Sequence, residues 1–240
     1  MNQKVALFVT CLVDQMFPEI GVAAVKLLRR NGFEVAFPEQ QTCCGQPFYS
    51  SGFLPEARQL ACQTIEIIED FSAVVIPGGS CTGMIAREYV HLFKDDPAWQ
   101  TRALAASRKC FELSDFLVAN VVLRPKDGVV LPVTYHDSCH MLRIMGIKDQ
   151  PRLLLEQVGC DVREMEESER CCGFGGLFSV RMRQVSQAMT GTKLSRAAGS
   201  GAQVLVTSDP GCLMQMRANL RPEDPLRIEH LAVVLEELAQ

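Results

Sequence analysis

The stretch SERCCGFGGLFS, Ser168–Ser179, places two adjacent cysteines directly before a run that holds three glycines in four residues. A second Cys-Cys-Gly element occurs in QTCCGQPFYS, Gln41–Ser50. Adjacent thiols rarely serve packing, and two neighbouring cysteines do not easily share one disulfide. The duplication therefore indicates an internal repeat, which is the first feature to test when a fold is inferred from sequence.

The cysteines around the two pairs repeat at fixed intervals. From the preceding single cysteine to the first cysteine of the pair there are 32 positions in both halves, Cys11 to Cys43 and Cys139 to Cys171. A further cysteine follows each pair, at 37 and 40 positions. Eight of the eleven cysteines thus form two sets. The first set is Cys11, Cys43, Cys44 and Cys81, and the second is Cys139, Cys171, Cys172 and Cys212.

The segments between the cysteines repeat as well. VALFVTC (5–11) and LPVTYHDSC (131–139) are apolar, β-branched runs that predict strands, and AVVIPGGSC and QVLVTSDPGC predict a buried strand before a turn and a cysteine. In each half a helical pattern between two such runs stops at Gly32 or Gly159.

Strands that alternate with helices predict an α/β fold with parallel sheets. We expect two tandem, pseudo-symmetric Rossmann-like domains, residues 1–125 and 126–240, because a segment with Pro and Gly at 123–128 separates the two copies.

The chemistry of each four-cysteine set follows from where parallel strands end. Functional groups of open parallel sheets gather at the carboxyl ends of the strands, so four thiols should converge at one edge of each sheet. Structural zinc is one candidate, but its closest cysteines are usually separated by two or more residues. Adjacent cysteines suit two different irons of one cluster better, so thiolate-held iron-sulfur clusters are favoured. The glycines after each pair allow close backbone approach and amide hydrogen bonds to sulfur.

The motifs VTCLVD, TCCGQP, GSC, HDSCH, CCGFGG and GCLM resemble the cysteine-rich CCG domain of iron-sulfur oxidoreductases. This domain is seen in heterodisulfide reductases and in the glycolate oxidase iron-sulfur subunit, and the resemblance extends from Val5 to about Leu238. It implies a tandem pair of α/β domains whose motif cysteines ligate the iron of iron-sulfur clusters. The fullest family pattern ends in Cys-x-x-Cys, whereas Gly78 and Asp209 stand at the first position of that element here. Four thiolates per half still suffice for an ordinary four-iron (4Fe-4S) cluster, up to two per chain.

The resemblance further implies a redox subunit of an oxidoreductase complex that oxidises L-lactate to pyruvate. Its implied partners are a ferredoxin-like iron-sulfur protein and a third lactate-utilization protein. Two alternatives stay open: a disulfide-reducing iron-sulfur oxidoreductase subunit, and a structural or redox-sensing protein that uses zinc or free thiols. The catalytic residues stay unknown at this point.

Two histidines flank a cysteine of the second set in TYHDSCH. Beside a cluster, His136 and His140 could donate a hydrogen bond or carry a proton. The first half has Phe8 where the second has His136, so it manages without this imidazole. The remaining cysteines, Cys62, Cys110 and Cys160, are expected to be structural core residues.

Composition excludes other classes of protein. A net charge of -4 and no cluster of Lys and Arg argue against nucleic-acid binding. No apolar run approaches the roughly 18 residues of a membrane span, and the N-terminus lacks the long apolar region of a signal peptide. We therefore expect a cytoplasmic protein, whose eleven cysteines would be ligands, redox groups or core residues rather than disulfides. The glycine run at 173–176 follows the cysteine pair rather than a first strand, which argues against a dinucleotide fingerprint.

Overall fold

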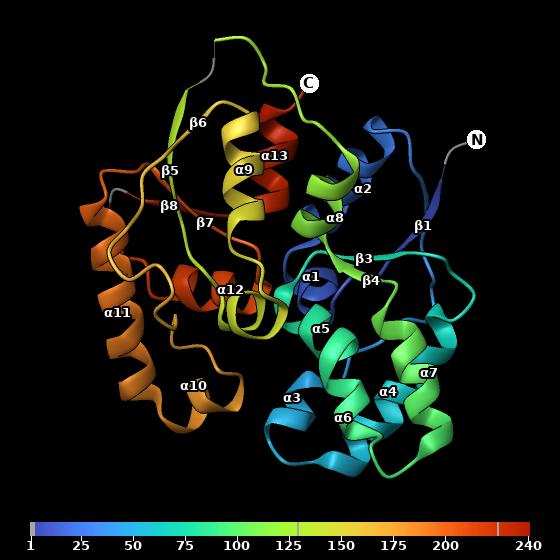
Figure 1. The fold of residues 1–240 in the computed structure, drawn as a ribbon. Helices are drawn as coiled ribbons and strands as arrows, with labels where there is room; N and C mark the ends of the chain where they lie inside the picture. The colour runs from blue at the N-terminus through green and yellow to red at the C-terminus, as the bar shows by residue number, and fades with distance from the viewer. Residues whose placement is uncertain (1–2, 129, 225) are drawn as a thin grey trace. The chain divides into compact units, whose positions relative to one another are not determined.

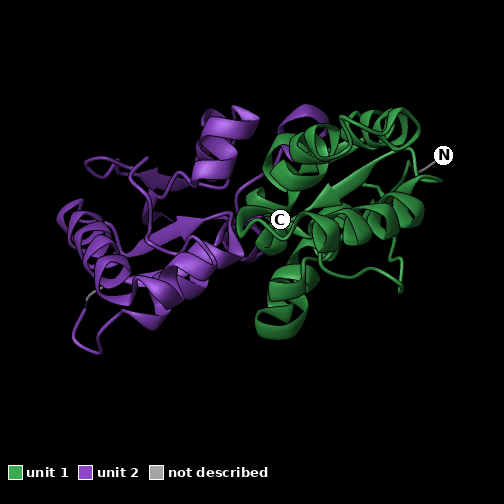
Figure 2. Cartoon of the chain, turned by 90° about the horizontal axis from the view of Figure 1, so that it is seen from below, with its two compact units in different colours: residues 1–116 green, residues 117–240 purple. Residues whose placement is uncertain are grey.

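The computed structural model describes residues 3–128, 130–224 and 226–240. The chain divides into two compact units, residues 1–116 and 117–240 (Figure 2). This division falls within the helix that spans residues 113–120. The sequence analysis places the boundary between the two copies after residue 125, and that boundary stays a prediction.

The first unit is a four-stranded parallel sheet in the order β2-β1-β3-β4 with its connecting helices. Its elements are β1 (Lys4–Leu7), α1 (Cys11–Met16), α2 (Pro18–Arg30), β2 (Glu34–Ala36), α3 (Gln46–Ser50), α4 (Leu54–Ile68), β3 (Val74–Ile76), α5 (Gly79–Gly83), the π-helix η1 (Met84–Glu88), α6 (Tyr89–Leu92), α7 (Pro97–Ser107), β4 (Cys110–Glu112) and α8 (Leu113–Asn120).

The second unit repeats this topology with the strand order β6-β5-β7-β8, again all parallel. Its elements are β5 (Leu131–Tyr135), the π-helix η2 (His140–Met145), α9 (Asp149–Gln157), β6 (Cys160–Val162), α10 (Leu177–Arg181), α11 (Arg183–Gly199), β7 (Val204–Thr207), α12 (Pro210–Ala218), β8 (Arg227–His230) and α13 (Leu231–Leu238). Figure 1 shows α9 and α13 on one side of this sheet and α11 on the other. The predicted α/β class, with two tandem Rossmann-like domains, is confirmed.

The sheets form because their central strands are apolar on both faces. Every residue of β3 and of β7 is buried, as expected for parallel strands covered by helices on both sides. In α2 the residues Ile20, Ala24, Leu27 and Leu28 repeat at helical spacing and are all buried. Each fully buried leucine or isoleucine contributes about 2 kcal/mol to folding.

The turns that lead into the second strand of each sheet are the predicted glycine stops. Gly32 follows α2 with φ +85° and Gly159 follows α9 with φ +83°, both in the left-handed region that favours glycine. Each glycine redirects the chain into a strand, β2 or β6, and the cysteine pair comes after that strand. Within the described ranges, no helix has the length and apolarity needed to cross a bilayer.

Candidate metal centres

Helix starts position the single cysteines of the first unit. After β1 ends, the Thr10 hydroxyl accepts a hydrogen bond from the amide of Val13 at 3.3 Å and caps α1, which makes Cys11 the first residue of that helix. Cys81 lies within α5, just past the end of β3. The pair Cys43-Cys44 lies in the loop that leads into α3. All four thiols therefore lie beyond the carboxyl ends of the strands.

The four sulfurs of the first set form a continuous chain of contacts, which we call the first centre. Cys43 is hydrogen-bonded to Cys11 on one side and to Cys44 on the other, and the Cys44 and Cys81 sulfurs are 3.1 Å apart. Hydrogen bonds from Cys11 and Cys44 lower the pKa of Cys43, which marks it as the thiolate of the group. The bond to Cys43 raises the pKa of Cys44, which is also fully buried.

One side of the first centre opens to solvent. Cys44 and Cys81 are buried, whereas Cys11 and Cys43 are half-exposed and line a pocket of about 330 Å³. Its wall also carries an acidic residue from α1 and one from the loop after β2. The pocket is lined by Val9, Cys11, Asp14, Gln15, Phe37, Glu39, Gln41, Thr42 and Cys43.

The second set is arranged in the same places but is less closely gathered; we call it the second centre. Asp209 caps α12 by accepting from the amide of Gly211 at 3.0 Å, and Cys212 lies in the first turn of that helix. The Cys172 and Cys212 sulfurs are 3.1 Å apart, and Cys171 is hydrogen-bonded to Cys172.

Cys139 lies apart from the thiol chain of the second centre. It immediately precedes η2 and is half-buried. Its sulfur lies 3.6 Å from Nδ1 of His140, the neighbouring residue, and interacts with Cys171 and Cys212 through repulsion between their charged forms rather than through a hydrogen bond between sulfurs. Burial raises the pKa of Cys139. The second centre therefore gathers three of its four predicted thiols through direct sulfur contacts.

The glycine after each pair holds the first sulfur of that pair. Gly45 donates its amide to Cys43 Sγ at 3.4 Å, and Gly173 does the same to Cys171 Sγ at 3.4 Å. Both glycines have left-handed φ values, +85° and +92°. A Cβ on Gly173 would meet the Ser186 carbonyl at 2.5 Å, so only glycine fits between the pair and α11.

A hydroxyl group holds the backbone of the second cysteine in each pair, a device that the sequence analysis missed. Tyr89 donates to the Cys44 carbonyl at 2.7 Å, and Thr190 donates to the Cys172 carbonyl at 2.7 Å. Gln215 donates to the Thr190 hydroxyl in turn, at 2.9 Å. The two hydroxyls come from different residue types on helices that do not correspond in sequence, so the repeat carried no sign of them.

A buried lysine fixes the segment before the second pair. Lys193 is fully buried and donates to the carbonyls of Glu167 at 2.8 Å and Ser168 at 3.0 Å. Glu167 has φ +52° and is the one non-glycine residue with a positive φ in the part of the chain that the structure describes. Burial lowers the pKa of Lys193 to about 8, against the attraction of Cys172 and nearby carboxylates. This anchor was also missed, although a lysine on the apolar side of a helix could have indicated it.

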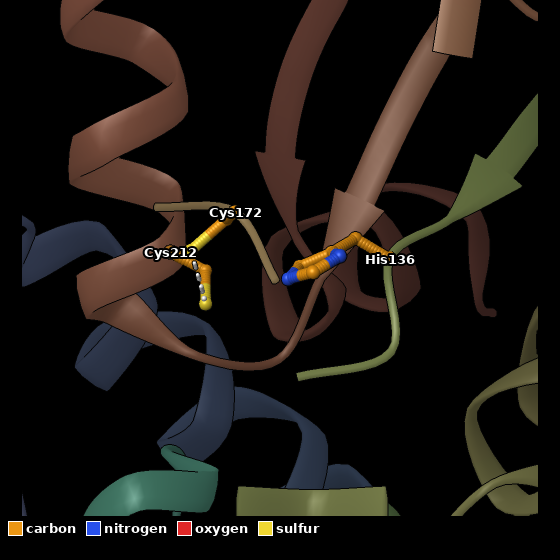
Figure 3. Close-up of side chains that lie close together, drawn as sticks. All are labelled: His136, Cys172 and Cys212. Carbon is orange, nitrogen blue, oxygen red and sulfur yellow. Dashed lines mark hydrogen bonds between the residues drawn. The ribbon is translucent and has the colours of Figure 1, made fainter. Parts of the chain in front are cut away.

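His136, which the sequence analysis singled out, lies against the second centre. It follows β5 and is 1 % exposed. Burial lowers its pKa to about 3, and the nearby Lys193 adds to this effect. One of its ring nitrogens lies within 4.8 Å of the sulfurs of Cys172 and Cys212 (Figure 3).

The other predicted residues are placed as follows. His140 is half-buried and faces Cys139 rather than the buried sulfurs. Cys110 and Cys160 are buried as the first residues of β4 and β6, and Cys62 lies half-buried in α4. Among the described residues, no hydrogen bond joins any of these three cysteines to another thiol. All eleven cysteines are free thiols.

The cysteine-rich domain model CCG matches this chain twice, over residues 5–86 and 133–217. The chain belongs to the CCG cysteine-rich domain family. Each match spans one complete four-cysteine set, so the family pattern and the two centres coincide.

Curated relatives are similar to this chain over nearly its whole length. Lactate utilization protein A of Bacillus subtilis (strain 168) is 45% identical over 236 residues, covering 97% of this chain and 98% of its own. Lactate utilization protein A of an Exiguobacterium species is 46% identical over 241 residues, with 98% and 97% covered. A crystal structure of a hypothetical protein from Helicobacter pylori matches the fold with a TM-score of 0.71 at 10% identity. The match covers 97% of this chain and 48% of that one.

The donor sets of both centres fit a metal that prefers sulfur. Thiolates are the ligands that zinc, cuprous ions and iron-sulfur clusters select, and here free thiols meet one another in pairs within a dry environment. Core packing does not require cysteine sulfurs to meet at 3.1 Å without forming a disulfide. The site chemistry therefore supports metal binding.

Proposed function

We propose that this chain is the iron-sulfur electron-transfer subunit of a system that oxidises L-lactate to pyruvate. The observation that carries the proposal is the pair of four-cysteine sets, all free thiols, each beyond the carboxyl edge of its own parallel sheet. The substrate is inferred from the similarity to proteins named Lactate utilization protein A. A reducing compartment such as the cytoplasm would keep the thiols available as ligands.

The chain would hold up to two 4Fe-4S clusters, and each bound cluster would supply one-electron transfer. The protein positions the thiols through helix starts at the single cysteines and through the amides of Gly45 and Gly173 at the pairs. It excludes water from the inner two sulfurs of each set. The ligands to the first cluster are Cys11, Cys43, Cys44 and Cys81, and those to the second are Cys139, Cys171, Cys172 and Cys212.

The pocket at the first centre argues that lactate is oxidised elsewhere in the system. Its wall carries Asp14 and Glu39, which repel a carboxylate substrate at neutral pH. The half-exposed Cys11 and Cys43 instead leave this centre close to the surface, where another redox protein can approach. We therefore propose that electrons pass between this chain and a ferredoxin-like iron-sulfur protein, with a third lactate-utilization protein in the same system.

The test is the metal content of the anaerobically purified protein, with an EPR spectrum of the reduced form. Two loaded centres predict about eight iron atoms and eight acid-labile sulfides per chain. Cys44→Ser and Cys172→Ser should each remove the iron of one centre, whereas Cys62→Ser, outside both sets, should leave iron unchanged. Zinc without sulfide, or full iron in both ligand variants, would contradict the proposal.

Zinc is the second candidate, and one observation favours it. His136 groups with Cys172 and Cys212, and a mixed set of cysteine and histidine ligands is common at structural zinc sites. The metal analysis separates the two candidates, because a zinc protein contains no acid-labile sulfide.

A further inference from the structure

His136 is a buried polar side chain without a hydrogen bond of normal geometry from the protein. Neither Nδ1 nor Nε2 has one, although the Ser168 carbonyl lies near enough to raise the pKa of the ring, and the imidazole is fully buried at the end of β5. Leaving a buried polar atom unpaired costs about 1–3 kcal/mol. Such a group in a folded protein takes its partner from outside the chain, either an ordered water or a bound ion.

The imidazole is directed at two ligand sulfurs. Figure 3 shows it extending from the end of β5 toward Cys172 and Cys212. Across the described residues, these three form the one group of three or more histidine, cysteine or acidic side chains whose ligand atoms all lie within 4.8 Å of one another. The sulfurs of the first centre form a more extended chain. Within the described part of the chain, the most compact group of candidate metal ligands therefore contains a nitrogen donor.

The thiol that should complete the second centre lies apart from this group. In the first centre, Cys11 is hydrogen-bonded to Cys43, whereas its counterpart Cys139 faces His140 Nδ1 at 3.6 Å. The position of His136 is occupied in the first unit by Phe8, which is fully buried and has no donor atom. The two copies therefore differ in donor chemistry. The second has the additional donor His136 where the first has Phe8, and its thiol Cys139 lacks the sulfur hydrogen bond that Cys11 makes.

We propose that His136 is a nitrogen ligand to the metal of the second centre, which is thereby a cysteine–histidine centre beside an all-cysteine first centre. The proposal rests on the proposed function for the identity of the metal as iron. His136 would take the place of Cys139 in the four-thiolate set proposed above. Replacing that thiolate by a neutral imidazole removes one negative charge from the ligand set, and histidine ligation raises the reduction potential of iron-sulfur centres. The second centre then has the higher potential of the two and receives electrons from the first.

The experiment is pulsed EPR on the reduced, anaerobically purified protein labelled with ¹⁵N-histidine. We expect a hyperfine coupling from a directly bound histidine nitrogen, which His136→Phe abolishes and His140→Asn retains. His136→Phe copies the residue of the first unit. His136→Cys keeps a ligand at the position, so it should retain iron, lose the nitrogen coupling and lower the potential of the second centre toward that of the first.

Three results would overturn the proposal. They are an iron-loaded protein with no histidine coupling, a coupling that survives in His136→Phe, and a potential that is unchanged in an iron-loaded His136→Cys. The first two leave the proposed function intact, because iron and sulfide are still present.

If the protein holds zinc without sulfide, the proposed function fails and His136 is tested separately. Cobalt is then substituted for zinc, and a paramagnetically shifted imidazole NMR signal that disappears in His136→Phe supports the ligand. A signal that persists in this variant, or no such signal in the native sequence, overturns it. A chain that binds neither metal overturns both proposals.

Discussion

Replacing Gly173 by alanine tests the steric account of the second cysteine pair. Gly173 has φ +92°, and a left-handed conformation costs a non-glycine residue about 1–2 kcal/mol. The new Cβ would also lie 2.5 Å from the Ser186 carbonyl and 2.9 Å from the Thr190 hydroxyl, so α11 has to shift. Overpacking of this kind costs about 1–3 kcal/mol. The variant should lose about 2–5 kcal/mol of unfolding free energy.

Alanine substitutions at two other glycines separate the conformational cost from the overpacking cost. Gly146 has φ +71° and no atom within 4 Å of an added Cβ, so Gly146→Ala carries the conformational cost alone, about 1 kcal/mol. Gly45 has φ +85° and an Ala57 carbonyl at 3.2 Å, so Gly45→Ala should fall between the two. Urea denaturation of the metal-free proteins, followed by circular dichroism, gives the three values. In the metal-loaded protein, Gly173→Ala should also lower the metal content of the second centre. Equal losses for Gly173→Ala and Gly146→Ala would refute the steric reasoning.

Three further predictions concern single groups. Burial raises the pKa of Glu112 from 4.5 to about 7, so the folded state holds a proton that the unfolded state has lost. Stability should therefore fall by up to about 3 kcal/mol between pH 4.5 and 7, and Glu112→Gln should remove this slope in urea titrations while Glu34→Gln, on an exposed side chain, keeps it. Tyr89→Phe leaves the buried Cys44 carbonyl unpaired and should cost about 1–3 kcal/mol by the same assay; no loss would show that another donor replaces the hydroxyl. In the metal-free protein, iodoacetamide should modify the half-exposed Cys43, whose pKa is lowered, well before the buried Cys44, and equal rates by mass spectrometry would contradict the described environment.

The fold was predictable because its determinants are local and repeated. Apolar, β-branched runs specify the strands, and Gly32 and Gly159 mark the turns through their left-handed φ. The cysteine intervals then place one set of thiols on each sheet, because the carboxyl ends of parallel strands share an edge. The strands and turns depend on residues close in sequence, and the cysteine sets depend on the number of residues between cysteines. Predicting them does not require knowledge of how the helices pack.

The remainder of the site depends on packing that the repeat does not encode. The hydroxyls of Tyr89 and Thr190 perform the same task from helices of different lengths and positions, α6 and α11. Lys193 was missed because its target is a pair of backbone carbonyls, which no residue pattern reveals. The separation of Cys139 from the other thiols was equally hidden, since its spacing matches that of Cys11.

The two units keep the elements that position sulfur and differ in the groups that surround it. Strand order, the glycine amide at the first sulfur and the hydroxyl at the second carbonyl occur in both. The first centre, by contrast, borders a pocket with two acidic side chains, while the second has Lys193 and His136 against its buried thiols. Positive charge and neutral ligands stabilise the reduced form of a redox centre, and negative charge destabilises it. If both centres hold clusters as proposed, divergence at these few positions would give one duplicated scaffold a potential difference, which a directional electron relay requires.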